Sequence, residues 1–164
     1  MKNLLLILLT CLFILSPNVV FSESMRDLRY RDGLWYKKFT QVPFSGKITG
    51  KDQGTIKNGK REGAWVSYWL SKNRPLKRKG NYKNGKREGA WVSYHKNGRL
   101  EFKGNYKNGK GEGERVVYND SGTLMQKGTY KDGKKEGYWV VYLKDGTVDK
   151  EYTGTFKNGK KISD

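Results

Sequence analysis

The stretch GNYKNGKREGAWVSY, from Gly80 to Tyr94, decides the fold, because close copies of it recur along the chain. The copies read GTIKNGKREGAWVSY from Gly54, GNYKNGKGEGERVVY from Gly104 and GTYKDGKKEGYWVVY from Gly128, and a shorter GTFKNGKK opens at Gly154. The opening glycines are 24 or 26 residues apart. A fixed period of this length is the signature of a repeat architecture. The sequence therefore predicts a repeat array over 54–164, with units that start at 54, 80, 104 and 128 and a truncated unit at 154.

Two turn signals divide each unit. The first is an Asn-Gly or Asp-Gly pair, which suits the positive φ values that a type I′ hairpin turn requires at both central residues. Its glycines are Gly59, Gly85, Gly109, Gly133 and Gly159. The second signal lies half a period further on, as at Asn97-Gly98. Two turns in 24 residues leave room for two short strands, so we predict a meander of hairpins.

The segments between the turns alternate as strands do. Leu100, Phe102, Gly104 and Tyr106 share one side of the first strand, opposite polar neighbours. Val, Tyr and Trp favour strands, and the chain contains only two alanines, which disfavours helix. We expect the tyrosines of successive units to align in a ladder that replaces an aliphatic core, and the opening glycines to pack against a ring. The predicted structural aromatics are Trp65, Tyr68, Tyr82, Trp91, Tyr94, Tyr106, Tyr118, Tyr130, Trp139 and Tyr142.

Composition limits the classes of protein that the chain can be. It has 164 residues, 34 Lys or Arg against 16 Asp or Glu, a formal charge of +18, one His and one Cys. This excludes a multidomain enzyme and a disulfide scaffold. Few aliphatic residues beside so much charge would ordinarily indicate disorder, but disordered basic tails do not keep a repeat in register.

Residues 1–22 have the order of a secretory signal peptide. Met1 and Lys2 precede an apolar run from Leu4 to Leu15, and Ser22 supplies a small residue before Glu23. The run is shorter than the roughly 20 residues of a membrane-spanning helix. We interpret Cys11 as part of this run, so cleavage near Ser22/Glu23 would leave a chain without cysteine or transmembrane span. The expected location is periplasmic or extracellular.

The unit resembles a known repeat. Phe102-x-Gly104-x-Tyr106 and Tyr152-x-Gly154-x-Phe156, each followed by Lys-Asn-Gly-Lys, resemble the MORN repeat. The match is closer to its bacterial variant, found in exported proteins of 24-residue repeats and in proteins labelled as antitoxin components. The resemblance covers about Phe44 to Lys161. It departs where the usual repeat has a second glycine after Glu-Gly, since this chain has Trp65, Trp91, Arg115 and Trp139 there.

The resemblance implies an all-β protein, an elongated antiparallel meander of stacked β-hairpin repeats. Such proteins are sometimes attached to membranes or to protein partners, and the family implies no catalytic centre. Phe44-x-Gly46-x-Ile48 echoes the opening strand, so we interpret 23–53 as a degenerate N-terminal cap.

The recurrent acids do not suggest catalysis. Glu62, Glu88, Glu112 and Glu136 would stand roughly 10 Å apart along the stack, too far for a retaining carboxylate pair. Each has Lys or Arg within two residues, so a solvated ion pair is expected. His95 is the chain's one histidine, which suggests neither a metal site nor a nucleophile relay. No glycine-rich phosphate loop is present. The expectation is a non-enzyme without cofactor or metal.

The recurrent lysines are the remaining candidate site. If the strands stack in register, these lysines form two rows of positive charge near one edge of the sheet. Such rows could hold lipid headgroups, an acidic glycan or an acidic protein. Lysine on an exposed sheet edge also prevents aggregation, so the rows can equally serve solubility. The rows are Lys57, Lys83, Lys107, Lys131 and Lys157, and Lys60, Lys86, Lys110, Lys134 and Lys160.

Two functions follow. The first is a non-catalytic exported module that binds or scaffolds at an anionic cell-envelope surface or a protein partner. The alternative is an antitoxin-like or immunity-like protein that neutralises a toxin by direct docking. Aromatics interleaved with lysines also occur on single-stranded nucleic-acid platforms, but an exported chain seldom meets that ligand.

Overall fold

The computed structural model describes residues 22–164. Apart from Ser22, the predicted signal peptide lies outside the described residues, and so does Cys11. The described chain is built of strands with one short 3-10 helix, η1 (Met25–Asp27), which confirms the predicted all-β class. The strands are β1 (Ser22–Ser24), β2 (Leu28–Arg31), β3 (Leu34–Lys37), β4 (Gly46–Thr49), β5 (Asp52–Lys57), β6 (Lys60–Tyr68), β7 (Leu76–Lys83), β8 (Lys86–Tyr94), β9 (Leu100–Lys107), β10 (Lys110–Tyr118), β11 (Leu124–Lys131), β12 (Lys134–Val141), β13 (Gly154–Lys157) and β14 (Lys160–Ser163).

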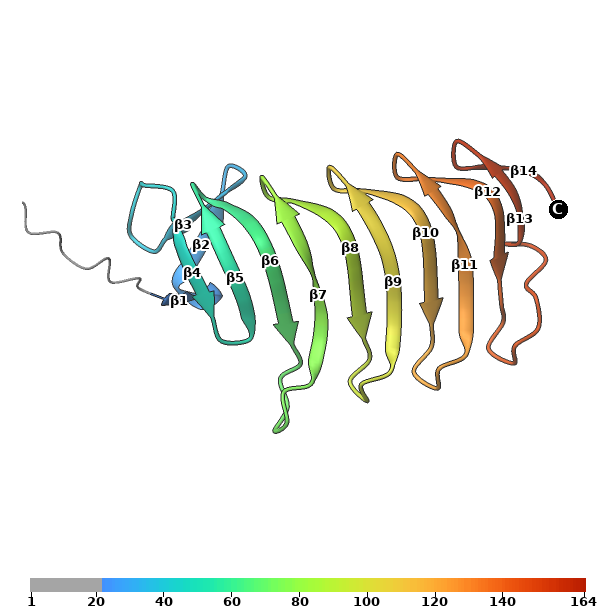
Figure 1. Cartoon of the computed structure of the whole chain (residues 1–164), viewed down its shortest axis with the longest axis horizontal. Coiled ribbons are helices and arrows are strands. Elements are labelled where there is room, and N and C mark those ends of the chain that lie inside the picture. The colour runs from blue at the N-terminus through green and yellow to red at the C-terminus, as the bar shows by residue number, and fades with distance from the viewer. Residues whose placement is uncertain (1–21) are drawn as a thin grey trace, which may run out of the picture.

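Twelve of the strands described over 22–164 form one sheet in chain order from β4 to β14, with β1 added beside β4. Among the strand pairs described over 22–164, only β1–β4 is parallel, and the other neighbours are antiparallel. β2 and β3 form a separate two-stranded sheet. Figure 1 shows the strands side by side in one elongated row. This is the predicted meander of stacked hairpins.

The predicted tight turns are present in all five units. Asn84 has φ 51° and Gly85 φ 80°, and the other four pairs have values within a few degrees of the same region. Both central residues of each turn therefore have the positive φ that a type I′ turn requires, and Asn, Asp and Gly reach it at little cost. A tight turn of this kind closes each hairpin at one end of the strands (Figure 1).

The aromatic ladder differs from the expected row of tyrosines. Ring contacts alternate between indoles and the phenols of the first strands: Trp65–Tyr82 at 5.8 Å between centroids, Tyr82–Trp91 at 5.0 Å and Trp91–Tyr106 at 6.4 Å, all edge to face. Trp65, Trp91 and Trp139 are buried, whereas the second-strand tyrosines Tyr68, Tyr94, Tyr118 and Tyr142 are half-buried. The tryptophans, more than the tyrosines, therefore replace the aliphatic core.

A bulge puts the tryptophans on this face. In β8, Gly89 has φ 65°, and three residues from Gly89 to Trp91 lie opposite Gly80 of β7. Because glycine tolerates this conformation, it allows the strand to bulge and aim Trp91 at the space over Gly80. A Cβ on Gly80 would overlap the indole, so the expected packing of the opening glycine against a ring is confirmed there.

The third unit fills the same space differently. Arg115 stands where the other complete units have tryptophan, and the ring of Phe102 covers Gly104 instead. The Arg115 guanidinium lies 4.6 Å from the Phe102 ring centroid and 5.6 Å from that of Tyr130. Gly111 replaces the arginine of earlier units and leaves room for Tyr130, whose ring is 3.2 Å from the position of a Cβ.

A small apolar core packs the N-terminal strands against the first unit. Leu28 from β2, Ile48 from β4, Ile56 from β5 and Trp65 from β6 are each no more than 5% exposed, with Trp35 of β3 packed against them. Only the segment from Gly46 onward continues the large sheet as a repeat strand would. The β2–β3 hairpin packs as a separate piece at the side of β4 and β5 (Figure 1).

Candidate functional site: the turn edge

The ten recurrent lysines lie at one end of the strands, beside the five tight turns. We call this end of the sheet the turn edge. In every unit the two lysines are directly opposite each other in the register, as Lys57 is to Lys60 and Lys83 is to Lys86. All ten are exposed, and none belongs to the four ion pairs found within residues 22–164. With about 10 Å per unit, five turns make a charged row about 40 Å long.

The recurrent glutamates have a different role from the expected ion pairs. The Glu88 carboxylate accepts a hydrogen bond at 2.8 Å from the backbone N–H of Asn108 in the next turn. Glu62, Glu112 and Glu136 do the same for Asn84, Asp132 and Asn158 at 2.8–2.9 Å. None of the four belongs to an ion pair in the described part of the chain. The expectation of ion pairing was wrong, because the register places each carboxylate against the neighbouring turn.

A second hydrogen bond fixes each turn to the preceding unit. The N–H of Gly109 donates to the carbonyl of Arg87 at 2.9 Å, and Gly85, Gly133 and Gly159 repeat the bond one unit away. At the first turn, Gly59 donates to the Phe44 carbonyl at 2.8 Å, and Ser45 Oγ accepts from Asn58 at 2.7 Å. Ser45 thus takes the place of the glutamate. The turns are held in a rigid row, so the lysine spacing is fixed by the backbone.

Beneath the turn edge, a cation lies against the rings in four successive layers. Arg87 lies 4.7 Å from the Trp91 ring and 5.1 Å from that of Tyr106, whose hydroxyl accepts from Nη1 at 3.0 Å. Arg61 and Arg115 make similar contacts with their own rings. Lys135 Nζ lies 4.7 Å from both Trp139 and Phe156, and burial lowers the pKa of its ammonium. These cations stabilise the aromatic stack through cation–π contacts.

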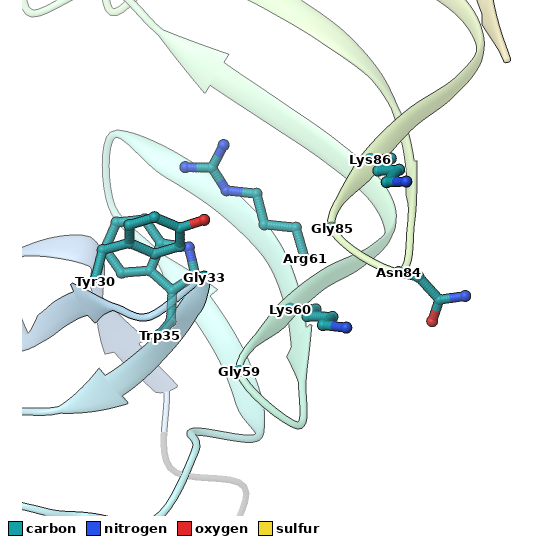
Figure 2. Close-up of a pocket in the computed structure, with 9 residues that line it drawn as sticks. All are labelled: Tyr30, Gly33, Trp35, Gly59, Lys60, Arg61, Asn84, Gly85 and Lys86. Carbon is teal, nitrogen blue, oxygen red and sulfur yellow. The ribbon is translucent and has the colours of Figure 1, made fainter. Parts of the chain in front are cut away.

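A pocket opens at the first end of the turn edge. It has a volume of about 390 Å³, and no acidic side chain lines it. Figure 2 shows Tyr30 and Trp35 as an aromatic wall on one side, with Lys60 and Lys86 on the other and the Arg61 guanidinium between them. The two rings are 4.9 Å apart, and Tyr30 is 63% exposed. A site with cations beside an exposed ring can hold a negatively charged group.

His95 is part of the framework. Its Nε2 lies 2.9 Å from the carbonyl oxygen of Tyr118, which can only accept, so Nε2 donates. Trp69 makes the matching bond to the Tyr94 carbonyl at 3.0 Å, one unit earlier. Over residues 22–164, no group of three metal-binding side chains gathers. In the same range, no helix has the length and apolar character to cross a membrane.

The architecture defines the class: an open sheet of strand–turn–strand units, with rings, cations and turn carboxylates at fixed places in each unit, is a β-hairpin repeat protein. The family model of the MORN repeat variant matches residues 87–108 and 111–132. These two adjacent units are therefore MORN-variant repeats, and they support the resemblance to that family. A search of curated proteins found no match. MORN repeats are generally non-catalytic modules that bind membrane lipids or proteins.

The sequence analysis did not find the pocket's aromatic wall. Tyr30 and Trp35 are brought to the turn edge by the β2–β3 hairpin, whose turn is Asp32-Gly33 with φ 50° and 78°. This Asp-Gly pair is the same signal that marks the other turns, and it could have predicted the hairpin. Where the hairpin packs depends on Leu28 and Trp35 meeting the core, which no repeat pattern indicates.

Proposed function

We propose that this chain is an exported, non-catalytic module that binds an anionic cell-envelope surface along its turn edge. The observation that carries the proposal is the fixed row of ten exposed lysines, two at every turn. The carboxylate nearest each internal turn is already engaged with backbone N–H groups. The row therefore presents a strong positive field to a flat, negatively charged partner.

The expected binding is the sum of many weak contacts. A lysine near an anionic membrane surface contributes about 1 kcal/mol at physiological salt, and the contribution fades beyond a Debye length of about 8 Å. A row about 40 Å long lets several lysines reach one surface together. Export rests on residues 1–22, whose sequence predicts a secretory signal.

The proposal is tested with two variants that lose the same number of positive charges at different places on the sheet. One variant replaces Lys83, Lys86, Lys107 and Lys110 with Gln, all on the turn edge. The matched control replaces Lys79, Lys96, Lys103 and Lys144 with Gln as well. These lysines are exposed and lie away from the tight turns. In co-sedimentation with vesicles containing phosphatidylglycerol, we expect the turn-edge variant to bind at least about tenfold more weakly and the control to lose much less.

Two results would contradict the proposal. Equal losses in both variants would mean that net charge alone drives binding. Negligible vesicle binding at low salt would remove the anionic-surface function, and one tight, stoichiometric protein partner from the envelope would then support the antitoxin-like alternative. Export is tested separately by the intact mass of the protein in the envelope fraction, where loss of residues 1–22 is expected.

A further inference from the structure

The connection between β3 and β4 exposes two apolar side chains to solvent. Phe39 is 97% exposed and Val42 is 74% exposed, the two highest values among the exposed large hydrophobic residues described. Burial of a phenylalanine in an apolar medium is worth more than that of most side chains. We call residues 38–43 the Phe39 loop.

Phe39 is also held in a conformation that its side chain disfavours. Its φ is 65°, at a turn in which the Thr40 N–H donates to the Lys37 carbonyl at 3.1 Å. Glycine or asparagine is the usual residue at such a position, and a bulky ring there is strained. A residue that is strained and also makes no stabilising contact is not explained by folding, and such outliers often belong to binding sites.

The Phe39 loop ends beside the turn edge but begins near η1, where the Lys38 N–H donates to the Asp27 carbonyl at 3.0 Å. Its last residue, Pro43, lies against the first tight turn, where a Cβ on Gly59 would be 3.2 Å from Pro43 Cβ. The Gly59 N–H donates to the carbonyl of Phe44. Figure 1 shows the connection from β3 to β4 reaching the tight-turn end of the strands where it enters β4. The Pro43 end of the Phe39 loop is therefore next to the row of lysines, while Phe39 itself follows Lys38 on the η1 side.

A basic groove lies directly beside Phe39. It has a volume of about 560 Å³ and includes Arg29, Arg31 and Lys37 in its lining, with no acidic side chain. Lys37 is paired with Glu23 at 2.5 Å, and Arg31 donates to Gln41 Oε1 at 2.7 Å and stacks on a tyrosine ring. Arg29 belongs to none of the four ion pairs found within residues 22–164, so the groove keeps positive charge for a headgroup.

We infer that the Phe39 loop inserts into the interfacial region of an anionic phospholipid bilayer, with the groove beside it holding a headgroup. The inference rests on the proposed function and identifies its surface. An acidic glycan offers negative charge but no hydrocarbon for Phe39 and Val42. A bilayer offers both, with the charge at its surface and the apolar region beneath, and interfacial binding combines these two terms.

The test uses Phe39→Gly in the full chain. Glycine removes the ring and relieves the positive φ, so the melting temperature should stay the same or rise. Binding to vesicles of equal parts phosphatidylglycerol and phosphatidylcholine should weaken about tenfold, while binding to heparin should not change. The matched control is Leu70→Ser, an apolar residue 66% exposed in the connection between β6 and β7, outside the Phe39 loop. The control should bind vesicles as the unchanged protein does.

A fluorescent probe reports insertion directly. Cys11 is the chain's one cysteine, so Cys11→Ser with Phe39→Cys gives a single labelling site. An environment-sensitive dye at position 39 should shift to the blue with the phosphatidylglycerol vesicles and not with heparin, and a dye at position 70 should not shift.

The outcomes separate the inference from the proposed function. Unchanged vesicle affinity of Phe39→Gly, or a dye that stays in water while lysine-dependent vesicle binding persists, overturns insertion alone. Equal losses toward vesicles and heparin also overturn it, because an apolar contact would not affect heparin. Absence of vesicle binding at low salt overturns both.

Discussion

At the scale of single residues, the glutamate that follows each tight turn links one unit to the next. Glu88 Oε2 accepts from the Asn108 N–H at 2.8 Å, across the boundary between the second and third units. This is a charge-assisted hydrogen bond to the backbone, and its net worth is about 1.5–3 kcal/mol at most, less at an exposed position. It is therefore a specific link between units and depends little on the surrounding lysines.

We expect Glu88→Ala to lower the free energy of unfolding by about 1 kcal/mol, because the Asn108 N–H loses its acceptor. Glu88→Gln keeps a carbonyl oxygen in reach and should lose less than half of that. Urea unfolding followed by tryptophan fluorescence measures both variants. If Glu88 acted through ion pairs, Gln would be as harmful as Ala, and moderate salt would abolish the effect of either substitution.

At the scale of the element, the third unit shows how one strand tolerates the loss of its tryptophan. Phe102 covers Gly104, and Arg115 covers Phe102, so two positions have changed together relative to the second unit, which has Arg78 and Trp91 there. Arg115→Trp alone should destabilise the protein by about 1–3 kcal/mol, because Phe102 already fills the space of the indole. Phe102→Gln alone should also destabilise it, since the ring over Gly104 is lost.

The double variant Phe102→Gln with Arg115→Trp copies the fourth unit, in which Gln126 and Trp139 occupy these places. We expect it to recover most of the stability, with a coupling free energy of about 1–3 kcal/mol in a double-mutant cycle. Urea unfolding of the four proteins gives this value. Simply additive losses would show that the two positions do not share one packing space.

Most of the repeat could be predicted from the sequence, and the exceptions have physical causes. Asn-Gly pairs predict the turns because few other residues adopt two positive φ values in succession. The bulge at Gly89 was not predicted, because a glycine inside a strand pattern does not by itself indicate a bulge. That bulge decides where Trp91 lies, so the expected tyrosine ladder became a ladder of alternating indole and phenol rings.

The candidate site was predictable to the same extent. The lysine positions follow from the turns, since residues on either side of a two-residue hairpin must be opposite each other. The pocket and the Phe39 loop depend on how β2 and β3 pack, through Leu28 and Trp35, and on one strained φ at Phe39. Neither belongs to the repeat, so its periodicity could not indicate them.

At the scale of the whole molecule, the charge that favours binding opposes folding. The chain carries a formal +18, and each tight turn places two lysines directly opposite each other, as at Lys83 and Lys86. A like-charge pair in this arrangement destabilises a sheet by roughly 0.2–1 kcal/mol. Because five such pairs lie in a row, the lysines of the turn edge repel one another, and salt can screen this electrostatic repulsion.

Salt should therefore have opposite effects on folding and on vesicle binding. Raising sodium chloride from low to physiological concentration should move the urea midpoint upward, because repulsion along the turn edge is screened, while vesicle affinity falls. The variant with Gln at Lys83, Lys86, Lys107 and Lys110 should be about 1 kcal/mol more stable at low salt and respond less to added salt. Urea unfolding and vesicle co-sedimentation in the same buffers measure both effects. A midpoint that falls with salt would mean that attractive pairs, such as Lys127–Glu114 at 3.1 Å, outweigh the lysine rows.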